Sequence, residues 1–145
     1  MSKITCSYLG DLKCEAKHLQ SGNLITTDAP IDHCGKGENF SPTDLLATSL
    51  GTCLLTIMSI KARSNGWELK NIYLNIEKIM TKNEVRKIAL LKIDIYIPDD
   101  LSIEKIDFIK NASKDCPVTR NLSESLDIKI NWHNQKLYKN NFEFK

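Results

Sequence analysis

Short runs that mix apolar and polar residues open the chain and predict β-structure. The runs 4–9 and 12–18 flank Gly10-Asp11, a two-residue turn signal, so they are expected to form a β-hairpin. Ser21-Gly22-Asn23 marks another turn, and 24–27 fits a third short strand. The segment 28–40 holds two glycines, a proline and several polar residues, which predicts a loop beside whatever element follows it.

A long apolar helix is predicted after this loop. Ser41 is expected as the N-cap, Pro42 as the first helical residue and Asp44 as the acidic residue of a capping box. Gly66 supplies a stop signal, so the helix is expected to run to Asn65.

The apolar residues of this helix cover more than one side of it. By 3.6-residue spacing, one face is expected to hold Leu46, Ser49, Leu50, Cys53 and Ile57. Other faces are expected to hold Leu45, Leu54, Leu55 and Met58. A helix that is apolar on most sides is normally buried on most sides, and in so small a chain we expect a second subunit to supply part of the cover.

The second half of the chain returns to alternating patterns around one further amphipathic helix. The expected elements are strands over 67–80, 91–97 and 127–132, a turn at Lys82-Asn83, a helix over 102–114, a short helical piece from Pro117 to Ser125, and a loosely held tail from Gln135. The order of strands, long helix, strands, helix and strand predicts the α+β class. With 145 residues, the whole of 1–145 is expected to be a single domain.

Charge and composition exclude several classes of function. The chain has 20 basic and 18 acidic residues, interspersed, for a net charge of +2. No basic stripe with interleaved aromatics appears, so nucleic acid is not expected as a partner. The longest apolar stretch, 45–60, is interrupted by Ser and Thr and falls short of the run that a membrane span needs, so it is interpreted as a core helix and no membrane partner is expected.

Five cysteines, an odd number, occur at positions 6, 14, 34, 53 and 116. The N-terminal residues show no apolar signal-peptide core, so a reducing, cytoplasmic location is expected and a structural disulfide framework is not. Cys6 and Cys14 lie eight residues apart with His18 nearby, which is a poor match to the spacing of zinc ligands. We therefore expect no metal and no cofactor, and interpret Cys6, Cys14 and Cys34 as strand or loop thiols.

Cys53 and Cys116 have the settings that thiol chemistry uses. Cys53 lies within the long helix, where a cysteine is often only a small buried hydrophobe. Cys116 precedes Pro117 at a predicted helix start, where positive backbone dipoles stabilise a thiolate, and Arg120 lies roughly one turn further on. On these residues alone a redox pair and two structural thiols both remain open.

Two motifs carry a resemblance to a known family. The helix Ser-Pro-Thr-Asp-Leu-Leu-Ala-Thr-Ser-Leu-Gly-Thr-Cys ending at Cys53, preceded by Gly-Lys-Gly-Glu from Gly35, resembles a signature of the OsmC/Ohr family of osmotically inducible and organic hydroperoxide resistance proteins. Cys116-Pro-Val-Thr-Arg-Asn-Leu resembles its second signature. The resemblance extends from about residue 3 to residue 133, with the elements in the same order.

This resemblance implies an OsmC-like fold, with antiparallel sheets wrapped around a long central cysteine-bearing helix in an intertwined homodimer. It also implies a thiol-dependent peroxidase that reduces organic hydroperoxides in oxidative-stress defence. Cys53 would attack the peroxide and become a sulfenic acid, and Cys116 would resolve it as a disulfide that an external dithiol reductant reopens.

The chain departs from the family pattern where the attacking thiol is activated. The family peroxidases carry an arginine in the loop before the helix and a glutamate after the helix proline; the corresponding positions here are His33 and Thr43. Candidate supporting residues are His33, Lys36 or Arg120 for the missing charge, with Glu38 or Asp44 to hold it. Each of these is also an ordinary loop or cap residue.

The missing arginine leaves an alternative open. That alternative is a non-catalytic or redox-sensing OsmC-like protein that binds a small hydrophobic ligand at the dimer interface. The reactivity of Cys53 separates the two, because only an activated thiol reacts well below pH 8.

Overall fold

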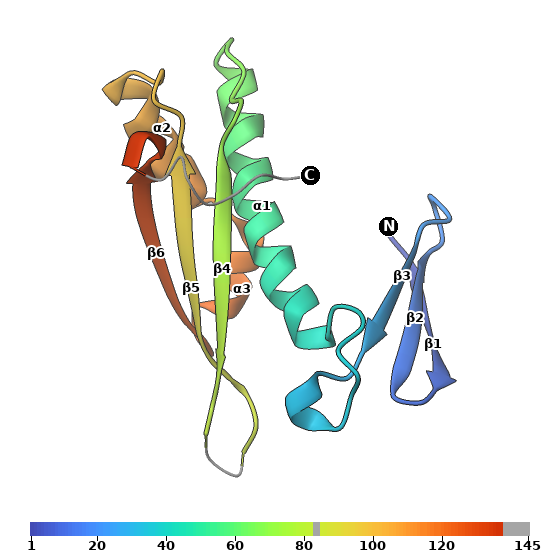
Figure 1. Cartoon of the computed structure of the whole chain (residues 1–145). Coiled ribbons are helices and arrows are strands. Elements are labelled where there is room, and N and C mark those ends of the chain that lie inside the picture. Colours follow the sequence, from blue (N-terminus) through green and yellow to red (C-terminus); the bar gives the residue numbers. More distant parts are fainter. Residues whose placement is uncertain (83–84, 138–145) are drawn as a thin grey trace. The chain divides into compact units, whose positions relative to one another are not determined.

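The computed structural model describes residues 1–82 and 85–137, and its contacts divide the chain into two compact units. The first unit comprises Met1–Leu46, and the second begins at Ala47 (Figure 1). The division falls inside the long helix. The expectation of one domain over 1–145 stays a prediction.

The first unit is a three-stranded antiparallel sheet. Its strands are β1 (Ile4–Gly10), β2 (Lys13–His18) and β3 (Leu24–Asp28), in that order across the sheet. The predicted hairpin is confirmed, but Gly10 pairs with Lys13, so the turn is Asp11-Leu12 and not Gly10-Asp11. Both turn residues have positive φ, 51° and 60°, which is the backbone that a two-residue hairpin turn demands.

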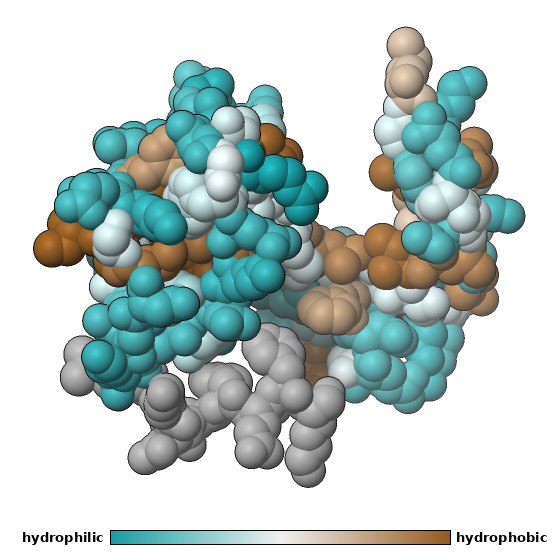
Figure 2. Space-filling view, turned by 90° about the horizontal axis from the view of Figure 1, so that it is seen from above, coloured by the Kyte–Doolittle hydropathy of each residue, from teal (hydrophilic) through white to brown (hydrophobic). Residues whose placement is uncertain are grey.

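One face of this sheet is apolar and has no cover within its own unit. Because side chains alternate along a strand and Cys6 pairs with Ala16, which pairs with Ile25, one face carries a shared apolar set. This apolar face holds Ile4, Cys6, Tyr8, Cys14, Ala16 and Ile25. Ile4, Tyr8 and Ile25 remain 65%, 67% and 49% exposed, and apolar side chains lie at the surface of this unit (Figure 2).

The loop after β3 is folded tightly against the strand end. Residues Ile31–His33 form a short 3-10 turn, η1. Gly35 lies so close to Ala29 that a Cβ there would be 1.6 Å from the Ala29 carbonyl oxygen. Asp28 is buried, and its Oδ2 accepts a hydrogen bond of 3.0 Å from the Glu38 N–H. A close backbone approach and a buried hydrogen bond therefore hold this loop in place.

Helix α1 spans Pro42–Ser64 and confirms the predicted helix. The capping box is present: the Ser41 N–H donates to Asp44 Oδ2 at 2.8 Å, and the Asp44 N–H donates to Ser41 Oγ at 3.2 Å. Gly66, at φ 79°, follows the helix end as the stop signal predicts.

The buried face of α1 in the second unit differs from the predicted one. Leu50, Leu54, Met58 and Ala62 are fully buried, whereas Cys53 is only half-buried. The buried face is therefore centred on Leu54 and Met58, one residue along the sequence from the predicted Cys53 and Ile57. By length and apolar composition α1 could also cross a membrane, so the expectation that this segment is too short and too polar for a span is wrong. Core helices of soluble proteins have the same length and composition.

The sheet of the second unit is mixed. Strands β4 (Tyr73–Met80) and β5 (Ile88–Ile97) pair antiparallel, and β6 (Asp127–Asn134) pairs parallel to β5. The expectation of antiparallel sheets therefore holds for the first sheet and for β4 with β5, and is wrong for β6. A parallel neighbour needs a long crossover, and the segment between β5 and β6 supplies it.

Two helices make that crossover. Helix α2 (Ile103–Ser113) begins at Ser102, whose Oγ accepts from the Lys105 N–H, and α3 (Pro117–Leu122) follows directly. Along the chain both helices lie between β5 and β6, where the sequence predicted helical pieces (Figure 1).

Two predicted segments differ from the structure. Strand β4 begins at Tyr73 and not at residue 67, and the Trp67 ring instead packs edge-on against Phe108 at 6.0 Å between ring centroids. The tail, predicted to be loosely held, begins with a short 3-10 helix, η2 (Gln135–Leu137). Gln135 Nε2 donates a hydrogen bond of 3.2 Å to the Tyr96 carbonyl, which holds this start against β5. The rest of that tail, 138–145, and Asn83 of the predicted turn lie outside the described residues.

The hydrophobic core lies between the second sheet and its helices. Its fully buried apolar side chains include Leu50, Leu54, Met58, Leu91, Ile93, Ile95 and Ile109. Gly51 lets α1 approach the sheet, because a Cβ there would be 2.5 Å from Ile76 Cδ1. This core fixes the position of α1 relative to the α2–α3 segment, and with it the positions of the two cysteines.

Candidate functional site

Cys53 lies near the middle of α1, beside the fully buried Leu54. Its side chain is half-buried, so it reaches the edge of the core. Packing of α1 against the core fixes the direction of the side chains along the helix, including that of Cys53.

Cys116 enters the same site from the crossover. It is the N-cap residue of α3, with extended backbone angles (φ −62°, ψ 116°), and its side chain is fully buried. Pro117 occupies the first helical position, where its fixed φ favours the helix. The N–H that proline lacks would have no partner within the helix at this position. The turn before it is closed by the Cys116 N–H, which donates to the Ser113 carbonyl at 3.2 Å.

The two thiols lie close enough together that each affects the pKa of the other, and the Val118 N–H affects the pKa of both. All five cysteines are unpaired in the structure. The second unit thus brings together the two cysteines that the sequence singled out.

The pKa values of this pair move in opposite directions. Burial, and then the neighbouring Cys116 thiol, raise the pKa of the Cys53 thiol above its ordinary value. Burial works against ionisation at Cys116 too, but the polar groups of Thr119, Cys53 and Val118 beside it outweigh burial and hold the pKa of that thiol below its ordinary value.

Thr119 is a member of this site that the sequence interpretation missed. Its hydroxyl and its backbone N–H lie close enough to Cys116 to lower the pKa of that thiol. Within 1–82 and 85–137, Thr119 Oγ1 and Asp28 Oδ1 are the buried side-chain oxygen atoms without a hydrogen-bond partner. A hydroxyl residue three positions after a helix N-cap was the available signal, because that position faces the cap.

Arg120 interacts with a carboxylate instead of a thiol. Its guanidinium donates to Asp115 Oδ1 at 2.7 Å, and Lys61 of α1 contacts the other oxygen of Asp115 at 3.2 Å. These two cations hold the pKa of Asp115 below its ordinary range, and Lys61 has the larger effect. Asp115 thereby ties α1 to the segment that carries Cys116.

The other candidate supporting residues belong to the first unit. His33 ends the η1 turn and is exposed. Glu38 forms an ion pair with Lys13, and Lys36 forms one with Asp11 at 2.5 Å. Asp44 serves the capping box of α1. Their predicted support of Cys53 stays a prediction.

No cluster of three or more metal-ligating side chains occurs in the part of the chain that the structure describes.

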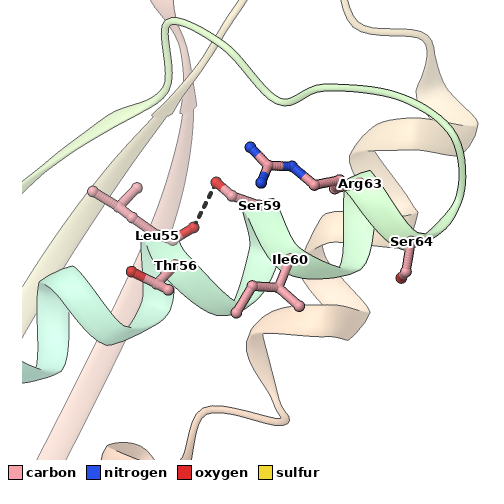
Figure 3. Close-up of a pocket in the computed structure, with 6 residues that line it drawn as sticks. All are labelled: Leu55, Thr56, Ser59, Ile60, Arg63 and Ser64. Carbon is pink, nitrogen blue, oxygen red and sulfur yellow. Dashed lines mark hydrogen bonds between the residues drawn. The ribbon is translucent and has the colours of Figure 1, made fainter.

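An open groove runs along one side of α1 in the second unit. We call it the α1 groove; its volume is about 600 Å³, and Figure 3 shows its lining side chains: Leu55, Thr56, Ser59, Ile60, Arg63 and Ser64. Ser59 Oγ donates to the Leu55 carbonyl at 2.8 Å, which satisfies its hydroxyl within the helix. Ile60 is 56% exposed, so this side of the helix is apolar without being covered.

Comparison with solved structures identifies the fold. A protein of Psychrobacter arcticus, described as an osmotic stress induced and detoxification response protein, is 41% identical, with a TM-score of 0.80 over 91% of this chain and 94% of that chain. An OsmC-like protein of Mycoplasma pneumoniae is 22% identical, with a TM-score of 0.77 over 92% and 96%. The organic hydroperoxide resistance protein OhrB of Bacillus subtilis is 18% identical, with a TM-score of 0.68 over 91% and 97%.

The family comparison agrees with these structures. No curated protein matches the chain. The family model for OsmC-like protein matches residues 35–131, which include both cysteine motifs. The predicted α+β OsmC-like fold is confirmed, and the chain belongs to the OsmC family.

Proposed function

We propose that this protein is a thiol-dependent peroxidase that reduces organic hydroperoxides in oxidative-stress defence. The observation that carries the proposal is the proximity of the Cys53 and Cys116 thiols, which come from different elements and lie close enough to affect each other's pKa. Two neighbouring thiols are the arrangement that a catalytic disulfide needs. Membership of a family that includes organic hydroperoxide resistance proteins supports the same chemistry.

The proposed reaction uses each thiol once. The Cys53 sulfur attacks the outer oxygen of the hydroperoxide; the O–O bond breaks, an alcohol leaves, and Cys53 becomes a sulfenic acid. The Cys116 sulfur then attacks the Cys53 sulfur, water leaves, and a disulfide forms. An external dithiol reductant restores both thiols. The half-buried Cys53 suits the first step and the fully buried Cys116 the second.

The working form is proposed to be an intertwined homodimer in the cytoplasm. The apolar face of the first sheet and the uncovered apolar side of α1 both call for cover that their own units do not supply. Five unpaired cysteines fit a reducing compartment.

A second candidate function is binding of a small hydrophobic ligand by a non-catalytic or redox-sensing protein. The raised pKa of Cys53 favours it, because a protonated thiol is a weak nucleophile. The α1 groove, with Leu55 and Ile60 in its lining, is the candidate binding surface.

Turnover separates the two candidates. Consumption of cumene hydroperoxide with a dithiol reductant is measured for the wild type, Cys53→Ser, Cys116→Ser and a Cys34→Ser control. The peroxidase proposal expects turnover in the wild type and the control, and none in Cys53→Ser. Absence of turnover in every variant contradicts it and favours ligand binding.

A further inference from the structure

The turn that precedes Cys116 carries a carboxylate that binds two cations from different helices. Asp115 lies between α2 and α3, directly before Cys116. Its Oδ2 lies 3.2 Å from Lys61 Nζ of α1, and its Oδ1 accepts a hydrogen bond of 2.7 Å from the Arg120 guanidinium of α3. Each oxygen therefore holds one cation, and one side chain connects two helices of the second unit.

Backbone hydrogen bonds hold this turn together from within. The Cys116 N–H donates to the Ser113 carbonyl at 3.2 Å, and the Cys116 carbonyl accepts from the Arg120 N–H at 3.1 Å. Arg120 is therefore bonded to Cys116 through the backbone and to Asp115 through its side chain. These bonds all lie within residues 113–120, so none of them fixes the turn relative to α1.

Lys61 supplies the connection to α1. It follows Cys53 by eight residues, which corresponds to about 12 Å along an α-helix. The apolar side of α1 is packed in the core, so Lys61 and Cys53 belong to one rigid element. The ion pair of Lys61 with Asp115 therefore joins the helix that carries Cys53 to the residue next to Cys116.

The size of this effect follows from the exposure of the pair. The side chains of Lys61 and Asp115 are each 43% exposed, so water screens their attraction, and such a pair changes an equilibrium by a few-fold at most. A carboxylate shared by two cations contributes more than an isolated pair does. By contrast, the pair of Lys70 with Glu68, at 2.9 Å, joins residues two apart in sequence and positions no other element.

We propose that Asp115 is a positioning residue that favours the disulfide between Cys53 and Cys116. Its bonds to Lys61 and Arg120 hold the Cys116 turn against α1 and narrow the range over which the two sulfur atoms move apart. The stability of an intramolecular disulfide rises with the effective concentration of one thiol at the other, so a narrower range favours the bond. The inference deepens the peroxidase function proposed above and rests on the use that this function makes of the disulfide.

Asp115 takes no part in the covalent chemistry. When the disulfide forms, the two thiols give two protons and two electrons to the oxidant, and one S–S bond replaces two S–H bonds. The oxidant is the hydroperoxide in the proposed reaction, and glutathione disulfide, which becomes two glutathione thiols, in the test below. The charges of Lys61, Asp115 and Arg120 are the same before and after, so these residues act on position alone.

The test measures the equilibrium between the dithiol and the disulfide in glutathione redox buffers, read out by alkylation of free thiols and mass spectrometry. The parent chain and all variants carry Cys6→Ser, Cys14→Ser and Cys34→Ser, so that only the site pair reacts. Asp115→Asn and Lys61→Gln are each expected to lower the equilibrium constant for disulfide formation about threefold. A constant equal to that of the parent in either variant would overturn the proposal.

Two controls separate the charge of this link from other effects of substitution. Lys61→Arg keeps the cation and is expected to stay within about 1.5-fold of the parent. Lys70→Gln removes a cation from the same unit and breaks its pair with Glu68, and is expected to leave the constant unchanged. A loss in either control equal to that of Lys61→Gln would overturn the proposal.

A double variant shows whether Lys61 and Asp115 act through one another. Lys61→Gln combined with Asp115→Asn is expected to lose about threefold, no more than either single variant, because both remove the same ion pair. A loss of about ninefold, the product of the two single losses, would show two independent effects and overturn the link between the helices.

The glutathione equilibrium needs no peroxide, so it distinguishes this proposal from the peroxidase function. The expected losses without consumption of cumene hydroperoxide by the wild type would overturn the peroxidase and retain the role of Asp115 in the disulfide. Peroxide consumption with equal constants in the parent and Asp115→Asn would overturn only the inference made here. Failure of the parent to form the disulfide in any buffer would overturn both.

Discussion

The two units of this chain differ in what their apolar side chains contact. In the second unit, Leu50, Leu54 and Ile93 are fully buried between a helix and a sheet. In the first unit, Ile4, Tyr8 and other large apolar side chains on the sheet stay about half or more exposed. The second unit therefore has its own hydrophobic core, and the first has a sheet with an apolar face that nothing in its unit covers.

The two units differ in whether they can be stable alone, and the two cysteines belong to the one that has a core. A three-stranded sheet without a packed face is marginal in water, so the first unit needs contacts from elsewhere to be stable. Cys53 and Cys116 both belong to the second unit, where the core fixes α1 against the crossover. The two thiols that the proposed chemistry uses are therefore carried by the unit that has its own core.

The largest effect is expected from removing core volume in the second unit. Leu54→Ala should lower the free energy of unfolding by about 4 kcal/mol, because a fully buried side chain leaves a cavity. Ile31→Ala, at a side chain 77% exposed in the first unit, should change it by less than about 0.5 kcal/mol. Denaturant unfolding of the two variants measures both, and equal losses would erase the contrast between the units.

A backbone contact in the first unit should matter nearly as much. Gly35→Ala is expected to cost about 3 kcal/mol, because its Cβ would collide with the Ala29 carbonyl, which cannot rotate away. Gly22→Ala has a positive φ but open space, so strain alone should cost about 1 kcal/mol. Thermal unfolding of both variants tests this order, and a harmless Gly35→Ala would contradict the tight loop.

The exposed face of the first sheet gives a test of the proposed dimer. Ile25→Lys should cost little in an isolated chain, since Ile25 is 49% exposed there. In a dimer that covers this face, an unpaired buried ammonium should weaken association by about 2 kcal/mol, roughly 30-fold in Kd. Sedimentation velocity measures the dimer fraction, with Lys17→Ala on the opposite face as control. Unchanged association in Ile25→Lys would show that the face is not an interface.

The smallest effect concerns a hydrogen bond on the second sheet. His133 Nε2 lies 2.8 Å from Asp94 Oδ1, and this bond, ahead of one from Asn131, holds the pKa of Asp94 below its ordinary value. A carboxyl with a lowered folded pKa adds stability above its unfolded pKa, near 3.8, and loses it as the pH falls through the folded value.

Replacement of His133 should therefore show its effect at neutral pH and not in acid. His133→Ala is expected to lower the free energy of unfolding by about 0.5 kcal/mol at pH 7 through loss of the Asp94 contact. The difference from wild type should shrink below about pH 3. Denaturant unfolding across this range checks the sign, and a difference that grows in acid would contradict it.

Local patterns in the sequence were enough to predict most elements. The capping box at Ser41 and Asp44, the stop at Gly66 and the alternation in β5 are local signals, and the structure confirms each. The parallel pairing of β6 with β5 was not predictable in this way, because the direction of a strand depends on the crossover that returns it to the sheet.

The site was predictable in its cysteines and not in their surroundings. Cys53 and Cys116 were singled out by their motifs, and the structure brings their thiols together. Arg120 was a candidate to supply positive charge near the thiols, and its guanidinium binds Asp115, a partner that the sequence did not indicate. Such contacts depend on side-chain directions across α2 and α3, which the sequence pattern does not specify. Thr119 had a signal in its position after the N-cap, although its buried oxygen became evident only in the structure.

The most direct test of the account is the product of one equivalent of cumene hydroperoxide added to the reduced protein. Peptide mass spectrometry then locates every oxidised cysteine. The account predicts a single disulfide between Cys53 and Cys116, with Cys6, Cys14 and Cys34 still reduced. An intact Cys53–Cys116 dithiol, or oxidation confined to the other three cysteines, would contradict it.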